Sequence, residues 1–393
     1  MMDHTNKKLI RITTVPMALR YLLPGQMRFM QEQGFEVVMI SAGGKELNDV
    51  IATEQCRHIT VPMTRKITPL QDLRCLWQLI RIFKKERPGI VHTHTPKAGL
   101  LGMLAAKVSG VKVRIHTVAG LPLMVEKGFK YQLLKNIERL TYAAATQVWP
   151  NSPSLLSFIK NEKLVPGKKL SMIGKGSTNG INTQRFNRAA LDEKLLAVVK
   201  NKIGYDPQQQ YLLCVGRLVA DKGIVELVNA FAGLNKTFPS LKLILVGEYE
   251  PTLDPLPAAT LAAIEQNKNI IAAGWSDQVE YYMAIADHFV FPSHREGFPN
   301  VLLQAGAMQL PVICSAIPGN TDIVQHDQTG LVFGTGDEAA IRDAISLAIS
   351  QPVQMKAMAE RLYEVVQTNY KRESVWQYLL DAYHALLNKV NRS

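Results

Sequence analysis

The stretch HFVFPSHREGFPNVLLQAGAMQLPVIC, residues 288–314, decides the fold of this chain. It begins with a short apolar run, 289–291, that predicts a buried strand. A turn rich in proline and glycine follows over 292–299, and an apolar run at helical spacing occupies 301–308. The pattern predicts a strand, a tight loop and a helix N-terminus. The free backbone N–H groups of such a terminus can hold an anion.

Polar residues of this stretch are placed where they can contact a ligand. Glu296 lies in the predicted loop, and Pro299 suits the first turn of the helix because a first-turn N–H needs no intrahelical partner. Asn300 and Gln304 are four residues apart, so they share one helix face. On these residues alone, an ordinary strand-to-helix connection with a solvated glutamate is an equally good interpretation.

An upstream stretch, YLLCVGRLVADKGIVELVNAF (211–231), repeats the order of strand, glycine turn and helix. Gly216 ends the predicted strand, and Arg217 and Lys222 flank the loop before Gly223. Two cations at a loop that leads into a helix suit a diphosphate, because arginine binds two oxygens at once and lysine acts as a point charge. Two basic loop residues taken alone are usually just solvated.

The two stretches together resemble the donor half of the retaining glycosyltransferases of family 4. These are two-domain enzymes of the GT-B fold that use nucleotide-diphosphate sugars. The resemblance covers most of the chain, is densest from about 140 to 335, and rests on GRLVADKG (216–223), REGFPNVLLQA (295–305), NGINTQRFN (179–187), LKLILVGEYE (241–250), AAGWSDQVEYYMAIADHFVFPS (272–293) and IPGNTDIVQHDQTGLVF (317–333). HTHTPKAGLLGMLAAKVSG (92–110) is similar to bacterial enzymes that build capsule, O-antigen or other glycan units on a polyprenyl-diphosphate carrier.

The resemblance implies an α/β fold of two Rossmann-like, doubly wound parallel-sheet domains facing a central cleft. It implies an N-terminal acceptor-binding domain over 1–185, a C-terminal donor-binding domain over 186–370, and a helix within 371–393 that returns to the first domain. A chain of 393 residues can bury two separate cores. KKLIRITTV (7–15) and FEVVMIS (35–41) predict strands on either side of a helix, as in a doubly wound domain.

The resemblance also implies roles for residues of the second domain. Glu296 is expected to approach the transferred sugar, while Arg217 and Lys222 neutralise the departing diphosphate, and these three are the expected catalytic residues. Gln304 stands where relatives carry a glutamate that accepts hydrogen bonds from ribose, and its amide keeps one acceptor oxygen. The expected donor-binding residues are Gly216, Gly247, Trp275, Val279, Gly297, Phe298, Asn300, Val301 and Gln304. Trp275 is expected to flank the nucleotide base or to lie in the core.

In the first domain, GIVHTHTP (89–96) predicts a buried strand that brings His92, His94 and Lys97 to its C-terminal end. The two histidines, two residues apart, point the same way. No carboxylate or cysteine stands nearby to complete a metal site, so we expect polar contacts with a sugar. Many family members place a histidine at the position of Ala119, and His116 is expected to project from the same side. The expected acceptor and sugar side comprises His94, Lys97, His116 and Gly120.

Neither a metal nor another cofactor is expected beyond the nucleotide sugar. The sequence contains no Asp-x-Asp, in agreement with the metal-independent chemistry that the resemblance implies. From the subgroup resemblance we expect a UDP-sugar rather than a GDP-sugar, while the sugar and the acceptor stay open. The four cysteines, Cys56, Cys75, Cys214 and Cys314, have no metal-ligand spacing and favour a reducing, cytoplasmic compartment.

Positive charge is concentrated in the first half of the chain. Residues 1–190 contain 29 Lys and Arg against 11 Asp and Glu, whereas the remainder contains 16 against 22. An anionic partner is therefore indicated: a nucleic acid, an anionic bilayer or a diphosphate-bearing substrate. Because no nucleic-acid-binding module is recognisable, we favour the cytoplasmic membrane surface and a lipid diphosphate, and expect no nucleic acid. Many basic proteins bind nothing in particular.

Two segments of this basic half are amphipathic. In 68–88, an apolar face of Leu73, Trp77, Ile80 and Phe83 predicts either a crossover helix packed on the sheet or a membrane contact. The apolar and basic residues of 120–145 suit a lipid-diphosphate acceptor at a bilayer, or a helix packed within the domain. No apolar run predicts a transmembrane helix, and the N-terminus predicts a first strand rather than a signal peptide. A cytoplasmic protein, peripheral at the inner face of the cell membrane, is expected.

These features favour a retaining glycosyltransferase that moves a sugar from a nucleotide-diphosphate donor to a lipid-linked or other glycan acceptor in cell-surface polysaccharide biosynthesis. Two alternatives stay open. A sugar-nucleotide epimerase of the same architecture would need an acid/base set for which no residues can be assigned. A non-catalytic nucleotide-sugar-binding protein is suggested by Gln304 and Ala119, where relatives carry a glutamate and a histidine.

Overall fold

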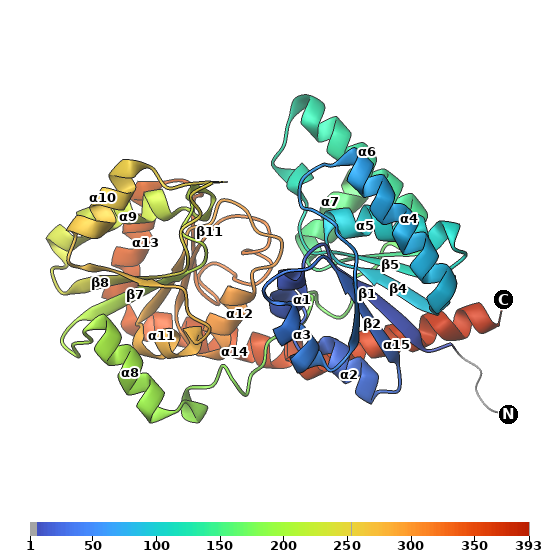
Figure 1. Ribbon diagram of the computed structural model, residues 1–393. Coiled ribbons are helices and arrows are strands. Elements are labelled where there is room, and N and C mark those ends of the chain that lie inside the picture. The colour runs from blue at the N-terminus through green and yellow to red at the C-terminus, as the bar shows by residue number, and fades with distance from the viewer. Residues whose placement is uncertain (1–5, 253, 393) are drawn as a thin grey trace. The chain divides into compact units, whose positions relative to one another are not determined.

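The computed structural model describes residues 6–252 and 254–392. The chain forms two compact units, Met1–Gly180 with Arg372–Ser393, and Ile181–Lys371. Each unit is built on a six-stranded sheet whose strand pairs are all parallel (Figure 1). The predicted α/β fold of two doubly wound parallel sheets is therefore confirmed.

The sheet of the first unit has the order β3-β2-β1-β4-β5-β6. Its strands are β1 (Lys8–Ile12), β2 (Glu36–Ser41), β3 (Arg57–Thr60), β4 (Ile90–Thr93), β5 (Val113–Val118) and β6 (Gln147–Pro150). Its helices are α1 (Pro16–Leu22), α2 (Gln26–Glu32), α3 (Leu47–Glu54), α4 (Pro69–Glu86), α5 (Pro96–Val108), α6 (Gly128–Ala144), α7 (Pro153–Asn161) and α15 (Arg372–Asn391). The strand order reverses direction between β1 and β4, which makes this pair the switch point of the sheet.

The sheet of the second unit has the order β12-β11-β10-β7-β8-β9. Its strands are β7 (Gln210–Val215), β8 (Leu241–Val246), β9 (Ile270–Gly274), β10 (His288–Phe291), β11 (Val312–Ser315) and β12 (Leu331–Phe333). Its helices are α8 (Glu193–Ile203), α9 (Ile224–Thr237), α10 (Ala258–Gln266), α11 (Val279–Ile285), α12 (Asn300–Ala307), α13 (Glu338–Ser350) and α14 (Pro352–Asn369). The topology repeats that of the first unit, so the switch point lies between β7 and β10.

Alternating side chains of the first sheet enter two separate cores. Ile10 and Ile12 of β1 pack on one face with residues of α4, α5, α6 and α7. Leu9 of the same strand packs on the other face with α1, α2, α3 and α15, where Tyr383 of the last helix is completely buried. Because successive strand residues point to opposite faces, apolar residues on both sides let one strand serve two helical layers.

The predicted apolar face of α4 is only partly right. Phe83 is buried and Ile80 is half-buried against the core, but Leu73 and Trp77 are 65% and 54% exposed. Cys75 and Leu79 are buried against α5 and the sheet instead. Both sets of residues recur at helical spacing, so periodicity alone could not choose between them. Packing selected one apolar stripe and left the other on the surface.

Glu138 of α6 is a buried carboxyl group, and burial raises its pKa from 4.5 to about 7. The native state therefore keeps a proton that the unfolded chain loses between these two values, and the free energy of unfolding falls as pH rises through that window. The permanently neutral variant Glu138→Gln should escape this loss, gaining up to about 3 kcal/mol over the wild type between pH 5 and pH 8. Urea unfolding at both pH values measures the difference.

The exposed Glu360 of α14 provides the matched control. Glu360→Gln should change the free energy of unfolding by a similar small amount at pH 5 and pH 8. If Glu138→Gln also changed the free energy of unfolding by the same amount at pH 5 and pH 8, the pKa of Glu138 in the native state could not be about 7.

Candidate active site

The candidate active site of the second unit lies at its switch point, where the chain leaves β7 and β10 in opposite directions. Gly223, the residue directly before α9, has a left-handed φ of +69°, and a Cβ atom there would lie 2.1 Å from the carbonyl oxygen of Pro292. Gly247, after β8, approaches Gly216 in the same way, since its Cβ would lie 1.8 Å from the Gly216 carbonyl oxygen. Only glycine permits these two backbone contacts, which bring the loops after β7, β8 and β10 together.

Three side-chain contacts join the loop after β7 and the helix that follows it to the loop after β10. Lys222 forms an ion pair with Glu296, and both side chains are largely buried. The Arg295 Nε donates to Asp221 at 2.8 Å, and the Nε2 of His294 lies 3.2 Å from the Glu226 carboxylate. The two residues with different expected roles, Lys222 for the diphosphate and Glu296 for the sugar, are therefore direct partners.

A second layer of polar residues holds Glu296 in place. The Ser293 hydroxyl donates to Glu296 Oε1 at 3.0 Å, and Ser315 at the end of β11 donates to the Ser293 carbonyl at 2.5 Å. The buried amide of Asn320 donates in turn to the Ser315 carbonyl at 3.1 Å. Gly319 allows the loop after β11 to pass close to the backbone, because a Cβ there would lie 3.1 Å from the Glu296 carbonyl oxygen.

Sequence reasoning did not single out this supporting layer. Ser293 and the PGN tripeptide (318–320) lie within stretches that carry the family resemblance, but their hydrogen-bond partners belong to other strands. The pairing of β10 with β11 brings them together. The types of these residues could have marked them as candidates for a functional site, but their contacts could not be predicted from the sequence.

Arg217 is exposed in the loop after β7. Its side chain makes no hydrogen bond or ion pair within the described part of the chain, whereas the neighbouring backbone is fixed by Leu218, whose N–H donates to the Glu248 carbonyl at 2.8 Å. A rigid loop therefore presents a guanidinium group that is available to an anion. Together with Lys222, which pairs with Glu296, Arg217 gives this loop two positively charged side chains.

The helix after β10 begins later than expected. Its first residue is Asn300, and Pro299 is the residue before the helix rather than part of its first turn. The Phe298 side chain is buried against Tyr370, with ring centroids 5.5 Å apart. Any contact of this residue with a donor would therefore be made by its backbone. Asn300, Val301 and Gln304 are half-buried on α12.

Trp275 follows β9 at the edge of the second sheet and is 49% exposed. The alternative that it is a core residue is wrong. Val279 begins α11 one turn later and is half-buried against the core. An exposed indole next to an apolar side chain is a surface on which a flat aromatic group can stack.

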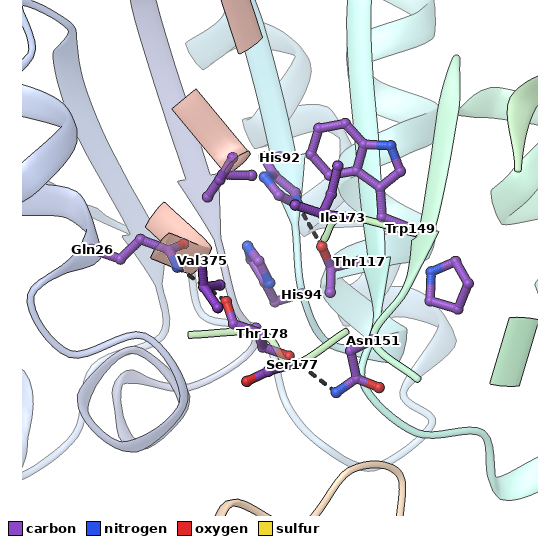
Figure 2. A pocket seen from close by; sticks show the side chains of 12 residues that line it. Gln26, His92, His94, Thr117, Trp149, Asn151, Ile173, Ser177, Thr178 and Val375 are labelled. Carbon is purple, nitrogen blue, oxygen red and sulfur yellow. Dashed lines mark hydrogen bonds between the residues drawn. The ribbon is translucent and has the colours of Figure 1, made fainter. Parts of the chain in front are cut away.

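In the first unit, His94 follows β4 and lines a pocket together with Gln26, His92, Thr117, Trp149, Asn151, Ser177 and Thr178, among others (Figure 2). His92 is held by hydrogen bonds that join its Nε2 to the Thr117 hydroxyl at 2.7 Å and its Nδ1 to the Tyr383 hydroxyl at 2.6 Å. His94 is only 2% exposed, and neither of its ring nitrogens has a hydrogen-bond partner among the described residues. Burial lowers the pKa of His94 well below its ordinary range, and the charge of Arg11 adds to this effect.

The other expected acceptor-side residues do not gather around His94. The Lys97 Nζ contacts Asp72 Oδ1 at 2.6 Å and the Thr64 hydroxyl at 3.2 Å, so it ties α5 to the first turn of α4 and the loop before it. His116 hydrogen-bonds through Nδ1 to the Thr93 hydroxyl at 2.8 Å, and its ring packs on Gly99 of α5.

The expectation for His116 is wrong. His116 is three residues from Ala119, an odd spacing, and its side chain faces α5 inside the domain, so it does not replace a histidine at that position. Its pKa is lowered to about 4 by burial, which keeps the ring neutral. Gly120 lies two residues beyond β5 and is half-buried.

The backbone contact at Gly223 yields a prediction. Gly223→Ala adds a Cβ that meets the Pro292 carbonyl and forces a left-handed residue, and we expect it to destabilise the protein by about 1–3 kcal/mol beyond the cost of the backbone conformation alone. Gly204→Ala is the control, because Gly204 has a similar φ of +62° and open space around its Cβ position. Urea unfolding of both variants gives the comparison, and equal costs would refute a contact at Pro292.

Comparison with known proteins agrees with this geometry. Residues 198–365 match the family model "Glycosyl transferases group 1", and residues 12–152 match "Glycosyl transferase 4-like". The capsular polysaccharide biosynthesis glycosyltransferase CapM of Staphylococcus aureus is 33% identical over 389 residues, which is 98% of each chain. An Escherichia coli UDP-Gal:alpha-D-GlcNAc-diphosphoundecaprenol alpha-1,3-galactosyltransferase is 26% identical over 85% of this chain and 86% of its own.

Among solved structures, a glycosyltransferase from Rickettsia africae superposes with a TM-score of 0.78 at 20% identity and covers 97% of this chain and 98% of its own. At that identity the likeness concerns the fold, and the full-length sequence match to the staphylococcal protein carries the assignment. The chain therefore belongs to the group 1 family of glycosyltransferases and has their GT-B fold.

Proposed function

We propose that the protein is a retaining glycosyltransferase of family 4 that transfers a sugar from a UDP-sugar to a lipid-linked diphosphate acceptor in capsule or related polysaccharide biosynthesis. The observation that carries the proposal is the Lys222–Glu296 pair at the switch point of the second unit, with Arg217 presented beside it. The two relatives support it, since one is a glycosyltransferase of capsular polysaccharide biosynthesis and the other is a UDP-Gal transferase that acts on a diphosphoundecaprenol-linked sugar.

The charges of this site suit a nucleoside diphosphate. Arg217 can bind two phosphate oxygens in parallel, and Lys222 adds a second positive charge in a partly buried position. Preorganised groups of this kind act on the charge that develops on a leaving group, and one donor typically lowers the barrier by about 3–4 kcal/mol. With no Asp-x-Asp in the sequence, we assign neutralisation of the diphosphate to these two residues and to backbone N–H groups near Gly297 rather than to a metal.

Glu296 is proposed to accept hydrogen bonds from hydroxyl groups of the transferred sugar. The Oε1 atom of Glu296 has two partners within the protein, the Lys222 ammonium and the Ser293 hydroxyl. An arriving diphosphate competes for the Lys222 charge and so releases acceptor capacity on the carboxylate. Donor binding and preparation of the sugar contact are thereby coupled through one ion pair.

A donor screen tests the proposal. We expect UDP-sugars, and not GDP-sugars, to raise the melting temperature of the wild type, because a ligand at a hundred times its Kd stabilises the native state by about 2.7 kcal/mol. Arg217→Ala should lose this stabilisation, while Arg361→Ala, an equally exposed arginine on α14, should keep it. Absence of stabilisation by any nucleotide would refute the proposed donor site.

The same proposal places the protein at the cytoplasmic face of a membrane, since a polyprenyl-linked acceptor is anchored there. No helix within the described ranges has the length and apolar character needed to cross a bilayer. The second apolar stripe of α4 is instead presented on the surface: Leu70 is 88%, Leu73 65% and Trp77 54% exposed. The Arg81 guanidinium lies over the Trp77 ring, 3.1 Å from its centroid, and Lys84 and Lys85 lie in the last turn of the helix.

Such a face suits a peripheral contact with anionic lipid. Apolar side chains gain free energy by entering the interfacial region, and each nearby Lys or Arg contributes about 1 kcal/mol on an anionic surface. Phe129 near the start of α6 is also largely exposed and extends the apolar character of this basic unit. We infer that the stripe Leu70, Leu73 and Trp77 rests on the bilayer.

Vesicle sedimentation tests the membrane contact. The double variant Leu70→Ser, Trp77→Ser should bind phosphatidylglycerol vesicles at least tenfold more weakly than the wild type, because two exposed apolar anchors are removed. Val353→Ser is the control, since Val353 of α14 is also strongly exposed. Unchanged binding by the double variant, or equal wild-type binding to neutral phosphatidylcholine, would contradict this surface.

A further inference from the structure

The pocket around His94 has a chemical character that the donor site does not explain. Its inner volume is about 20 Å³, enough for one oxygen-sized group, and the space including its open mouth is about 340 Å³. His94 lines it with two ring nitrogens that have no partner within the described residues. A buried polar side chain without a partner is costly, about 1–3 kcal/mol, so its retention points to a ligand.

A buried positive charge lies behind this pocket. Arg11 of β1 is completely buried, and its guanidinium contacts His92 Nδ1 at 3.2 Å, the Tyr383 hydroxyl and the Gln26 side-chain oxygen. Among the described residues none of its contacts is a carboxylate. The nearby Glu54 is occupied elsewhere, accepting backbone N–H groups at the start of α2, for example from Gly25 at 2.6 Å.

The charge of Arg11 acts on this pocket. A charge in a low-dielectric interior is screened far less than at the surface, and none of the residues that line the pocket is a carboxylate. Glu54, outside the lining, offsets part of the Arg11 charge. Arg11 reaches the pocket through His92, whose ring centroid lies 4.2 Å from that of His94. This arrangement suits an anion.

Hydroxyl groups at the mouth provide further donors. The Ser177 hydroxyl accepts from the Gly180 N–H at 3.0 Å, and the Thr178 hydroxyl accepts from the Asn151 side-chain amide at 3.1 Å. Each hydroxyl keeps its own proton available to donate. Ser177 is held with a left-handed φ of +68° while its N–H donates to the Asn151 carbonyl at 2.7 Å. The strained backbone keeps these groups at the pocket.

We propose that this pocket binds a phosphate group, with one oxygen seated against His94 and others at the Ser177 and Thr178 hydroxyls. The rest of a phosphorylated molecule would extend from the mouth. The phosphate can come from two sources, the diphosphate of a lipid-linked acceptor or free inorganic phosphate. The acceptor version rests on the proposed function, whereas phosphate recognition itself follows from the pocket.

The ¹⁵N signals of the His94 imidazole report the site directly in histidine-labelled full-length protein. One titration uses inorganic phosphate, and a second uses farnesyl diphosphate as a short prenyl diphosphate. Saturable shifts of the His94 signals are expected with at least one probe. Tighter binding of farnesyl diphosphate identifies the acceptor as the source, and equal or tighter binding of phosphate identifies the free anion. Absence of a saturable shift with both probes overturns the proposal.

Variants separate this pocket from other phosphate sites. Asn151→Asp adds a negative charge at nearly constant size and should weaken binding at least tenfold, and His94→Gln should do the same when affinity is measured by calorimetry. His58→Gln is the control, because His58 bonds to the Ser41 hydroxyl at 2.9 Å and does not line this pocket. Unchanged affinity in Asn151→Asp or His94→Gln overturns the site.

Two further measurements keep the interpretation unambiguous. Melting curves establish that each variant is folded. If Asn151→Asp does not fold, the affinity of His94→Gln alone decides the test. The titration is repeated in Arg217→Ala, where the His94 shifts should persist; their loss there would place the anion in the donor site and overturn the pocket assignment. Because the nucleotide screen uses the second unit, failure of the donor proposal and failure of this one are read separately.

Discussion

The contact between the backbones of Gly223 and Pro292 is the constraint on which the candidate active site depends. The two residues belong to loops that leave neighbouring parallel strands, β7 and β10, in opposite directions. Because glycine leaves room for a carbonyl oxygen where any other residue would place a Cβ, the loops can touch. Lys222 and Glu296 then meet as an ion pair within a shared, largely buried space. Charge pairing at the site is thus a consequence of main-chain packing.

The first unit repeats this topology with different side chains at its switch point. There the loops after β1 and β4 are joined by the hydroxyls of Thr14 and Thr95, which lie 2.7 Å apart. Its sheet also contains buried polar residues, Arg11 and His92, in positions where parallel sheets usually carry apolar ones. Buried polar networks cost stability unless every group is satisfied, and the unsatisfied His94 nitrogens show where this network is incomplete. The two units therefore share a scaffold and differ in their polar groups, a cation–carboxylate pair in one and a pocket lined by two histidines, with Arg11 behind it, in the other.

Much of the fold and part of the site could be predicted from local pattern. Apolar runs bounded by glycine and proline placed β7, β10 and the helices that follow them, and the residues around Gly223 and Glu296 were sufficient to indicate the family. The same reasoning misjudged α4, whose two apolar stripes are equally regular. It also did not foresee that the Lys97 amine contacts Asp72 at 2.6 Å. Errors of this kind arise where a side chain has two chemically acceptable environments and only packing selects one.

The sequence alone determined which segments form strands and helices, where the loops carry glycine, and how charge divides between the two halves of the chain. Each of these features depends on residues that are close together in the chain. The partners of the functional side chains were decided by tertiary structure. Gln26, His94, Asn151 and Leu379 line one pocket although the chain between the first and last of them spans nearly the whole protein. Their meeting requires the order of six paired strands and the docking of α15 beneath them. Such contacts follow from the sum of many burial and pairing energies, which no short stretch of sequence contains.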